Sequence, residues 1–367
     1  MSSRIAIEVH PTANPTPVEA RSRVLSSPLG FGQKFGDHMV CIPYREGEGW
    51  LSGELKGYCP LSLDPASAVL HYGQSVFEGF KAFRQVNGEI ATFRPDANAK
   101  RFQNSAKRLA MAELPAETFI EAADLLIFHD RDWVPGDKGT SFYVRPLLIA
   151  TERCLGVRAS REYLFVLFGS PAGDYFSGGL RPVKVWVCED YVRAAPGGTG
   201  EAKFGGNYAA SLIAQAEAAE QGCEQVVWLD AIHHTNIEEM GGMNIFFVFQ
   251  RGGTTTLVTP KLSGSLLPGV TRNSLLTLAP RLGLVVEERT ISLAEWITAA
   301  AAGDMTEAFA CGTAAVITPI GNVKHRLGEF SMGNGQGGAV AQRLRECLLS
   351  IQYGESEDTF GWMHRVC

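Results

Sequence analysis

The sequence predicts a mixed α+β fold in two domains. Its 367 residues are long enough for two domains, and the 45% apolar content suffices for two hydrophobic cores. Strand-like apolar runs mix irregularly with stretches of helical periodicity, which favours a mixed α/β architecture over a regular doubly wound sheet. The run SPAGDYFSGGLRP separates two strong strand patterns, YLFVLF and VKVWVC. We therefore expect a small N-terminal domain at 1–172, a linker at 173–182 and a large domain at 183–367.

The first domain is expected to begin with an irregular arm. Pro and Ser are frequent in the first forty or so residues, so regular structure is expected from about Asp37. After it, MVCIPY, GWLSGEL and YLFVLF are typical of strands. Residues 96–109 place Phe102 and Ala106 on one helical face, with Asp96 as the expected N-cap.

The second domain is expected to open with the strand VKVWVC and the glycine-rich PGGTGEAKFGG. A helix is expected from Asn207 to about Gly222, with the stripe Ala209, Leu212, Ile213, Ala216 and Ala219. EQVVWLD and IEEMGGMNIFFVF are typical of two strands, joined through AIHHTN as a hairpin. Another helix is expected from Thr271, and Ser292 and Glu295 have capping-box spacing. A last stripe consists of Val340, Leu344, Leu348 and Ile351.

Composition excludes several classes of function. With 33 basic and 39 acidic residues, the net charge of −6 argues against nucleic-acid binding. The uncharged run 308–323 is too short for a bilayer span and contains Gly312 and Pro319, so no membrane segment is expected. The eight cysteines form no C-x-x-C and no metal-ligand spacing, and no secretion signal is visible. A cytoplasmic protein with reduced thiols and no metal is expected.

Two formal motifs are interpreted as turns. The G-x-G-x-x-G at residues 333–338 follows only a short FSM and precedes a helix, which does not suit a dinucleotide site. His233 and His234 are adjacent in a polar turn, and adjacent residues of a strand point to opposite faces. We expect both segments to be solvated turns.

Three other features together indicate pyridoxal 5′-phosphate chemistry. Lys203 lies in a glycine-rich loop, residues 269–271 begin a helix whose free N–H groups form an anion site, and residues 312–314 form a second tight turn. Glu238 and Glu239 lie on an apolar strand, where a buried acid needs a charged partner. A nucleophilic lysine, a phosphate cup and an acid for the pyridine nitrogen are what this cofactor requires. Periodicity leaves the choice between the two glutamates open.

Seven segments resemble, in order and spacing, the branched-chain-amino-acid aminotransferases, which are pyridoxal-phosphate enzymes of fold type IV. They are FEGFKAFR, FRPDANAKRF, YVRP, AAPGGTGEAKFGGNYAAS, WLD followed by IEEMGGMN, LSGSLLPGVTRNS and EAFACGTAAVITP. The motifs K-F-G-G-N-Y and E-x-F-x-x-G-T-A are specific to this group, and GDHMV and GGTG look most like bacterial, especially actinobacterial, members. The resemblance runs from about Phe35 to the C-terminal helix and implies the two-domain fold of D-amino-acid aminotransferase.

The resemblance also implies roles at the cofactor. Lys203 is implied to form the Schiff base and to move the proton between the substrate Cα and the cofactor C4′. Glu239 is implied to bind the pyridine nitrogen and Tyr208 the phenolic oxygen. The residues implied to hold the phosphate are Arg101, Val270, Thr271 and Thr313.

Further roles are implied at the substrate. Its α-carboxylate would meet the turn at Thr313 and Ala314. The apolar pocket would be lined by Phe35, Tyr72, Phe77 and Tyr143, with Leu155 and Val157 from a neighbouring subunit, since the family is dimeric or larger. Arg145 shares a strand face with Tyr143, so we expect it to receive the distal carboxylate of glutamate. The alternative for Arg145 is a structural ion pair.

The resemblance implies amino transfer between Leu, Ile or Val and 2-oxoglutarate in a ping-pong cycle, with small amino and 2-oxo acids as the partners. D-amino-acid aminotransferases and aminodeoxychorismate lyases share the fold and remain alternatives, although YVRP and the aromatic set favour branched L-substrates. A binding or regulatory protein without chemistry is a third alternative, which the intact Lys203 and Glu239 disfavour.

The chain departs from its relatives at three places. Gly242 replaces a threonine of some members, which removes a hydroxyl near the substrate. Ala315 and Thr318 stand where the mitochondrial type has a redox C-x-x-C. Asn236 stands where close relatives often have an aromatic residue.

Overall fold

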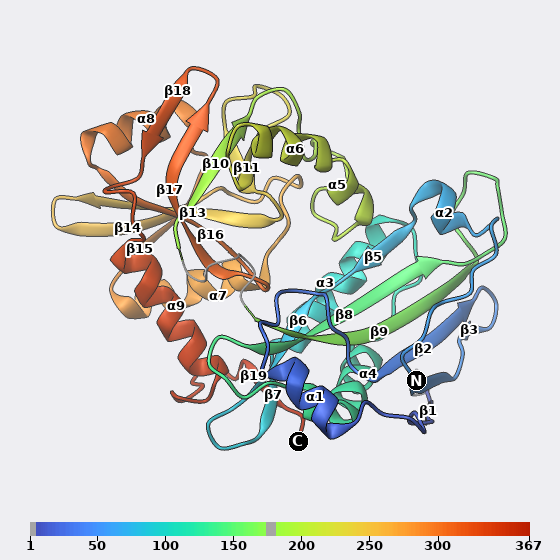
Figure 1. Ribbon diagram of the computed structural model, residues 1–367. Helices are drawn as coiled ribbons and strands as arrows, with labels where there is room; N and C mark the ends of the chain where they lie inside the picture. The colour runs from blue at the N-terminus through green and yellow to red at the C-terminus, as the bar shows by residue number, and fades with distance from the viewer. Residues whose placement is uncertain (1–4, 174–180) are drawn as a thin grey trace. The chain divides into compact units, whose positions relative to one another are not determined.

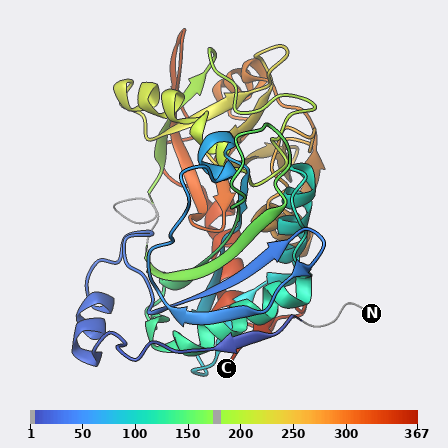
Figure 2. The same ribbon diagram turned by 90° about the vertical axis from the view of Figure 1, so that its right-hand side faces the viewer.

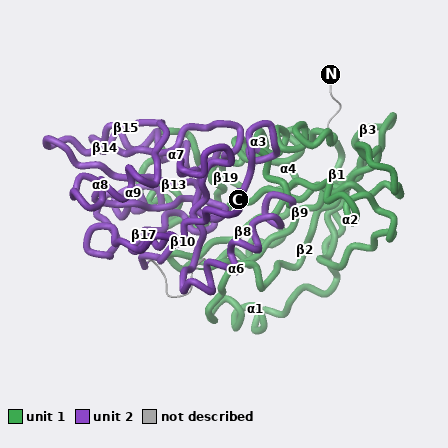
Figure 3. Tube along the Cα trace, turned by 90° about the horizontal axis from the view of Figure 1, so that it is seen from above, with its two compact units in different colours: residues 1–177, 202–205, 350–367 green, residues 178–201, 206–349 purple. Residues whose placement is uncertain are grey.

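The computed structural model describes residues 5–173 and 181–367, and the chain divides into two compact units (Figure 3). The first unit is Met1–Ser177, Ala202–Gly205 and Ser350–Cys367, and the second is Gly178–Glu201 and Gly206–Leu349. Most of the expected linker, 173–182, falls outside the described residues. Two segments placed by the sequence in the second domain, 202–205 and 350–367, belong to the first unit.

The first unit is built on a mixed sheet that has ten strands within the described residues (Figure 1). They are β1 (Ile7–Val9), β2 (His38–Arg45), β3 (Gly49–Trp50), β4 (Gly53–Gly57), β5 (Ser75–Phe77), β6 (Phe80–Arg84), β7 (Ile90–Phe93), β8 (Ser141–Ala150), β9 (Glu162–Ala172) and β19 (Met363–Arg365). The order is β1-β4-β2-β9-β8-β6-β7-β19, with β3 on β2 and β5 on β8. The long antiparallel pair β8–β9 runs from Ser141 opposite Ala172 to Ala150 opposite Tyr163.

Helices pack on this sheet, and the hydrophobic core of the first unit lies between the helices and the strands. They are α2 (Ala68–Tyr72), α3 (Pro95–Arg108), α4 (Ala116–His129) and the short 3-10 helix η1 (Arg131–Trp133). Phe102 of α3, Phe119 of α4 and Phe165 of β9 are fully buried, with ring centroids 5.5 to 6.3 Å apart. The apolar stripe expected around Phe102 and Ala106 is therefore the buried face of α3.

The start of α3 corrects one expectation. Asp96 lies in the first turn, and Arg94 occupies the N-cap position in a left-handed conformation. Proline at residue 95 suits the first helical position because its fixed φ matches the helix and its missing N–H is not needed there. The Asp96 carboxylate still interacts favourably with the positive end of the helix dipole.

The N-terminal arm is more regular than expected. It contains β1, which pairs in parallel with β4, and the helix α1 (Val18–Leu25), which has no buried residue. Figure 2 shows α1, in dark blue, standing beside the first sheet. The Pro- and Ser-rich composition concealed both elements, because only a few of their apolar residues, Ile7, Val24 and Leu25, pack on the core, and these are only partly buried.

The second unit contains a second mixed sheet (Figure 1). Its strands in the described chain are β10 (Val183–Cys188), β11 (Gln225–Leu229), β12 (Ile237–Met240), β13 (Met243–Arg251), β14 (Thr254–Thr259), β15 (Val285–Glu288), β16 (Met305–Gly312), β17 (Val316–His325) and β18 (Gly328–Ser331). The order is β12-β11-β10-β17-β16-β13-β14-β15, and β12 also pairs with β13. This extra pairing closes the strands from β12 to β13 into a barrel-like ring.

The ring has one turn that the sequence analysis missed. IEEMGGMNIFFVF forms the two strands β12 and β13, because Gly241 adopts a φ of +56° and reverses the chain. The hairpin expected between β11 and β12 is confirmed, with His233 and His234 exposed at its turn.

The remaining helices lie in the second unit, apart from the first residue of α5 and the last three of α9, which belong to the first unit. They are α5 (Gly205–Ala209), α6 (Leu212–Glu220), α7 (Val270–Leu278), η2 (Ala279–Leu282), α8 (Leu293–Ala302) and α9 (Ala339–Gln352). The single helix expected from Asn207 is wrong: it is two helices, and α6 buries Ala214 and Ala218 while Leu212 and Ile213 are exposed. The cap of α8 is confirmed, since Ser292 Oγ accepts a bond from the Glu295 N–H at 3.0 Å. No described helix is long and apolar enough to cross a membrane.

Candidate active site

Lys203 is held through its backbone in the first unit. Its N–H donates to Ser105 Oγ on α3 at 2.9 Å, and its carbonyl accepts from the Phe77 N–H at 3.0 Å. The half-buried side chain places Nζ 4.9 Å from the centre of the Phe77 ring, within cation–π range. Both hydrogen bonds use main-chain atoms of Lys203, so they fix its backbone and do not involve the side-chain amine.

Arg101 is oriented by a partner that the sequence analysis missed. Its Nε and Nη2 atoms lie 2.6 and 2.9 Å from the two carboxylate oxygens of Glu78, and both side chains are buried. A two-point pair of this kind fixes the plane of the guanidinium. Glu78 is part of the motif FEGFKAFR, but a single sequence does not show that it reaches a helix residue 23 positions away.

Arg145 lies among aromatic residues of the same unit. Its guanidinium carbon is 4.9 Å from the centre of the Phe77 ring and 5.3 Å from that of Tyr143, and Nη2 donates to the Tyr143 hydroxyl at 3.2 Å. Its buried Nε has no hydrogen-bond partner, and in the described part of the chain no carboxylate pairs with this arginine. The structural ion pair considered as an alternative is therefore absent among these residues.

The other expected pocket residues have different neighbours. Phe35 stacks on Tyr58 with centroids 5.3 Å apart, and the Tyr72 hydroxyl donates to the Leu155 carbonyl. Leu155 is 65% exposed and Val157 84% exposed. The structure thus groups Phe77, Tyr143, Arg145 and Lys203, whereas Phe35 and Tyr72 contact other parts of the first unit.

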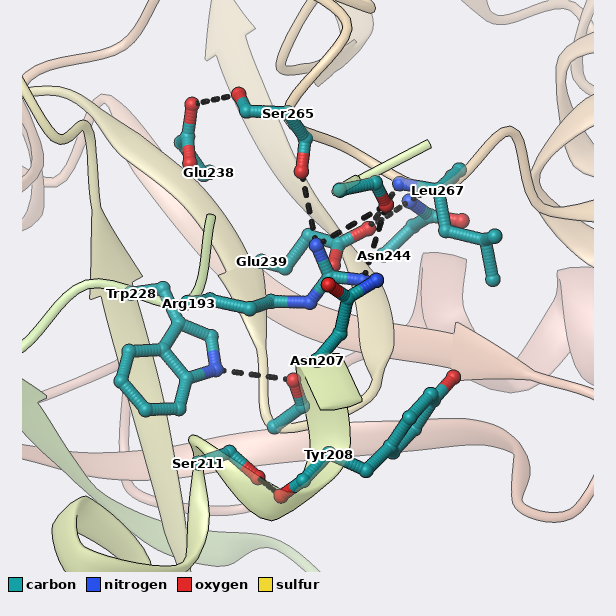
Figure 4. A network of polar contacts seen from close by, with 12 residues as sticks. Arg193, Asn207, Tyr208, Ser211, Trp228, Glu238, Glu239, Asn244, Ser265 and Leu267 are labelled. Atoms are coloured by element: carbon teal, nitrogen blue, oxygen red, sulfur yellow. Dashed lines mark hydrogen bonds and ion pairs between the residues drawn. The ribbon is translucent and has the colours of Figure 1, made fainter. Parts of the chain in front are cut away.

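Glu239 is buried on β12 in the second unit and is surrounded by polar partners (Figure 4). Its Oε1 atom accepts bonds from the Asn244 amide at 2.9 Å and the Leu267 N–H at 3.0 Å. Its Oε2 atom lies 2.8 Å from Nε of Arg193, which is also buried. Two donors and a close guanidinium stabilise the ionised carboxylate. The need of a buried acid for a cation was visible in the sequence, but Arg193 itself was not identified.

Glu238, the adjacent residue, has a different environment. Ser265 Oγ donates to its Oε1 atom (Figure 4), while its Oε2 atom has no hydrogen-bond partner among the described residues. Burial raises the pKa of Glu238, and the Ser265 bond and the charge of Arg193 only partly offset this. The two adjacent acids are therefore distinguished by their partners, a distinction that periodicity did not provide.

Helix α7 begins with an open N-terminus. Gly269 occupies the N-cap position and supplies no side-chain bond, and Val270 and Thr271 follow as buried residues of the first turn. Such an end offers backbone N–H groups and a positive dipole to an anion. The helix starts one residue earlier than expected.

Tyr208 lies on α5 and has Gly242 beside it. A Cβ atom at residue 242 would lie 3.2 Å from Cε1 of Tyr208, so any larger residue would press on the ring. A threonine at position 242 would therefore push against the Tyr208 ring, whereas glycine leaves the ring where it lies.

The turn expected between two apolar strands is present. Residues 313–315 connect β16 to β17, and Gly312 pairs with Val316 across the turn. Val316 has a φ of +62°, a left-handed conformation that costs a β-branched residue free energy. Strain of this kind is concentrated at functional turns.

Comparison with known proteins identifies the family. A family model described as amino-transferase class IV matches residues 75–323. The branched-chain-amino-acid aminotransferase of Mycolicibacterium smegmatis is 56% identical over 366 residues, covering 100% of this chain and 99% of that protein. The chain belongs to the branched-chain-amino-acid aminotransferase family. This agrees with the resemblance in the motifs.

Solved structures of branched-chain aminotransferases have the same fold. The Escherichia coli enzyme superposes with a TM-score of 0.73 at 29% identity, over 89% of this chain and 99% of that one. The enzyme of the archaeon Thermoproteus uzoniensis, solved with norvaline, also gives a TM-score of 0.73, at 25% identity, over 89% and 99%. The predicted fold type IV is confirmed.

Class IV aminotransferases use pyridoxal 5′-phosphate, and the residues of this chain fit that cofactor. Within the first unit Lys203 offers an amine on a fixed backbone, and within the second unit Glu239 is a buried carboxyl group with polar partners and α7 has an open helix end; these are the kinds of group that an aldehyde, a ring nitrogen and a phosphate need. The chain is thus a pyridoxal-phosphate-dependent transaminase.

We expect this transaminase to be indifferent to mild thiol oxidants. Ala315 and Thr318 cannot form the redox pair of the mitochondrial type. Cys311, the cysteine closest to the turn in sequence, is fully buried, and burial raises its pKa far above the usual range, which keeps the thiol protonated and unreactive. The measurement is activity after peroxide treatment, with and without dithiothreitol. Inactivation that dithiothreitol reverses would contradict the prediction.

Proposed function

We propose that this chain transfers the amino group between Leu, Ile or Val and 2-oxoglutarate in a ping-pong cycle. The observation that carries the proposal is the setting of Arg145, a guanidinium without a carboxylate partner in the described chain, placed against Phe77 and Tyr143. An enzyme with these two substrates has to accept an aliphatic side chain in one half-reaction and a carboxylate in the other. Aromatic walls suit the former and an unpaired guanidinium the latter.

Roles at the cofactor are assigned from the resemblance of the motifs, and the contacts of Lys203, Arg101 and Glu239 support them. Pyridoxal phosphate, when bound, supplies an electron-accepting ring. Lys203 is the amine that attaches the cofactor aldehyde and then holds and moves the proton of the substrate Cα. Glu239 would bind the ring nitrogen, and Tyr208 would bind the phenolic oxygen. The phosphate would be held by Arg101, whose guanidinium Glu78 orients, and by Val270, Thr271 and Thr313.

The substrate α-carboxylate is assigned to the turn at Thr313 and Ala314. The strained conformation of Val316 supports this assignment, because it holds the turn in a shape that an unstrained hairpin would not adopt. Backbone N–H groups in such a turn are suited to an anion. Phe35, Tyr72, Phe77 and Tyr143 are assigned to the side-chain pocket, and Gly242 leaves room beside Tyr208.

Leu155 and Val157 are assigned to the pocket of a second copy of the chain. Both are largely exposed in the single chain, which leaves them available to a neighbouring subunit. We accordingly propose a homo-oligomer, at least a dimer, that works in the cytoplasm. Size-exclusion chromatography with light scattering measures the number of chains in the oligomer.

Arg145→Met is expected to separate the two half-reactions. Removing one partner of a buried charge pair costs roughly 2–5 kcal/mol, so reaction with glutamate should slow by a large factor. Reaction with leucine should change much less, because no carboxylate is then bound at this end. Single-turnover absorption spectra, recorded separately with leucine and glutamate, measure both.

Tyr143→Phe serves as the matched control. It removes only the hydroxyl that accepts a bond from Arg145 and leaves the charge, so it is expected to impair glutamate less than Arg145→Met does. Equal impairment of leucine and glutamate in Arg145→Met would assign Arg145 a structural role.

A further inference from the structure

Arg193 connects three segments of the second unit (Figure 4). Its side chain is 4% exposed. Nη1 donates to the Ser265 carbonyl at 2.8 Å, and both Nη1 and Nη2 reach the Gly200 carbonyl at 3.3 Å. Nε lies 2.8 Å from the Glu239 carboxylate. One guanidinium therefore contacts the loop before Lys203, the loop before α7 and the acid on β12.

The loop before Lys203 and the loop before α7 pack closely against each other at Gly200 and Ser265. A Cβ atom at Gly200 would lie 2.1 Å from the Ser265 carbonyl oxygen, so only glycine allows the two segments to approach this closely. The carbonyls of Gly200 and Ser265 then both face the same guanidinium. The orientation of Arg193 is consequently set by backbone groups and not by Glu239 alone.

Arg193 forms an ion pair with only one of two adjacent buried acids. Glu239 has Arg193 as an ion-pair partner together with two N–H donors, whereas Glu238 has the Ser265 hydroxyl. A buried carboxyl without a cation favours its protonated form. The geometry thus places the negative charge on Glu239 and leaves Glu238 the better site for a proton.

We propose that Arg193 is a positioning residue that keeps Glu239 ionised and directed at the pyridine nitrogen of the cofactor. It acts through Glu239 and touches neither substrate nor cofactor. An ionised Glu239 accepts a charge-assisted bond from a protonated ring nitrogen, whereas a neutral Glu239 can only donate a weaker, neutral bond to an unprotonated ring nitrogen. The inference rests on the proposed role of Glu239.

The test compares two ligands of the cofactor-free full-length chain. One is pyridoxal 5′-phosphate, and the other is its 1-deaza analogue, in which C–H replaces the ring nitrogen. Both carry the aldehyde and the phosphate, so the contributions of Lys203 and α7 cancel in the ratio. We expect the wild type to favour the natural cofactor by about ten- to a hundredfold in dissociation constant, as for a charge-assisted hydrogen bond. In Arg193→Met the ratio is expected to fall to the few-fold preference of a neutral hydrogen bond.

The pH dependence separates positioning from general destabilisation. In Arg193→Met, Glu239 lacks its cation and should ionise only at higher pH, so the preference should return as the pH rises. The wild type should keep its preference over the same range. Arg193→Gln retains donors for the two carbonyls but no charge, and it should behave like Arg193→Met; it replaces that variant if the methionine protein does not fold.

Two further variants complete the test. Because Arg193 acts through Glu239, the double variant Arg193→Met, Glu239→Gln should show the same preference as Glu239→Gln alone. The matched control is Arg272→Met, which removes an equally buried guanidinium of the same unit, bound to Glu288 and the Pro260 carbonyl. The control should keep the wild-type ratio.

The outcomes are distinct. A wild-type ratio in Arg193→Met at neutral pH would overturn the inference and leave the proposed function intact. Failure of the wild type to bind pyridoxal 5′-phosphate would overturn the proposed function. A wild-type ratio near one would overturn the role of Glu239 and, with it, that of Arg193.

Discussion

Lys203→Ala is expected to abolish transamination and to leave the fold intact. The variant loses the amine assigned both to cofactor attachment and to proton transfer, so the rate should fall by more than about 10⁴-fold. The fold should persist because the hydrogen bonds to Ser105 and Phe77 use the main chain of Lys203, which alanine retains. Turnover of leucine with 2-oxoglutarate and the circular dichroism spectrum measure the two parts.

Lys138→Ala is the control for this experiment. Lys138 is an exposed lysine of the first unit that pairs with Glu355 at 2.8 Å, and its loss should change activity little, since exposed ion pairs contribute only about 0–1 kcal/mol. More than trace turnover in folded Lys203→Ala would show that another group is the catalytic amine.

Glu239→Gln is expected to cost much more activity than Glu238→Gln. Loss of a charged group that stabilises a reacting centre typically costs about 10²–10³-fold in rate. Glu238→Gln should cost less than about tenfold, because the Ser265 bond can persist and burial already raises the pKa of Glu238 toward the neutral form. The comparison of kcat/KM for the two variants decides the assignment.

Glu238 is itself the matched control for Glu239, because it occupies the next position of the same strand and is also buried. Equal losses in the two variants would remove the assignment of Glu239 to the ring nitrogen. A larger loss in Glu238→Gln would reverse it.

The fold could be predicted from the sequence wherever the spacing of apolar residues matched a single strand or a single helix. The strand β9 and the buried face of α3 around Phe102 followed from apolar spacing alone. The pattern failed at Gly241, where an apolar run continues through a chain reversal that only the positive φ reveals. It also failed in α6, because the choice of Ala214 and Ala218 as the buried face depends on packing against Trp228 of the next strand, β11.

The candidate site shows the same division. The motifs around Lys203, Glu239 and Thr271 carry specific residue types at specific spacing, so a resemblance identified them. Glu78 and Arg193 were missed because their importance lies in contacts with residues 23 and 46 positions away. A single sequence shows that a buried acid needs a cation, but it does not show which cation the fold brings to it.

The rate of amino transfer to 2-oxoglutarate from a panel of amino donors tests the central claim most directly. With the purified holoenzyme, the account predicts that L-leucine, L-isoleucine and L-valine react well and that D-alanine does not react. It also predicts that each branched donor converts the cofactor absorption spectrum before any 2-oxo acid is added. Transfer from D-alanine but from none of the three branched L-amino acids would contradict the account.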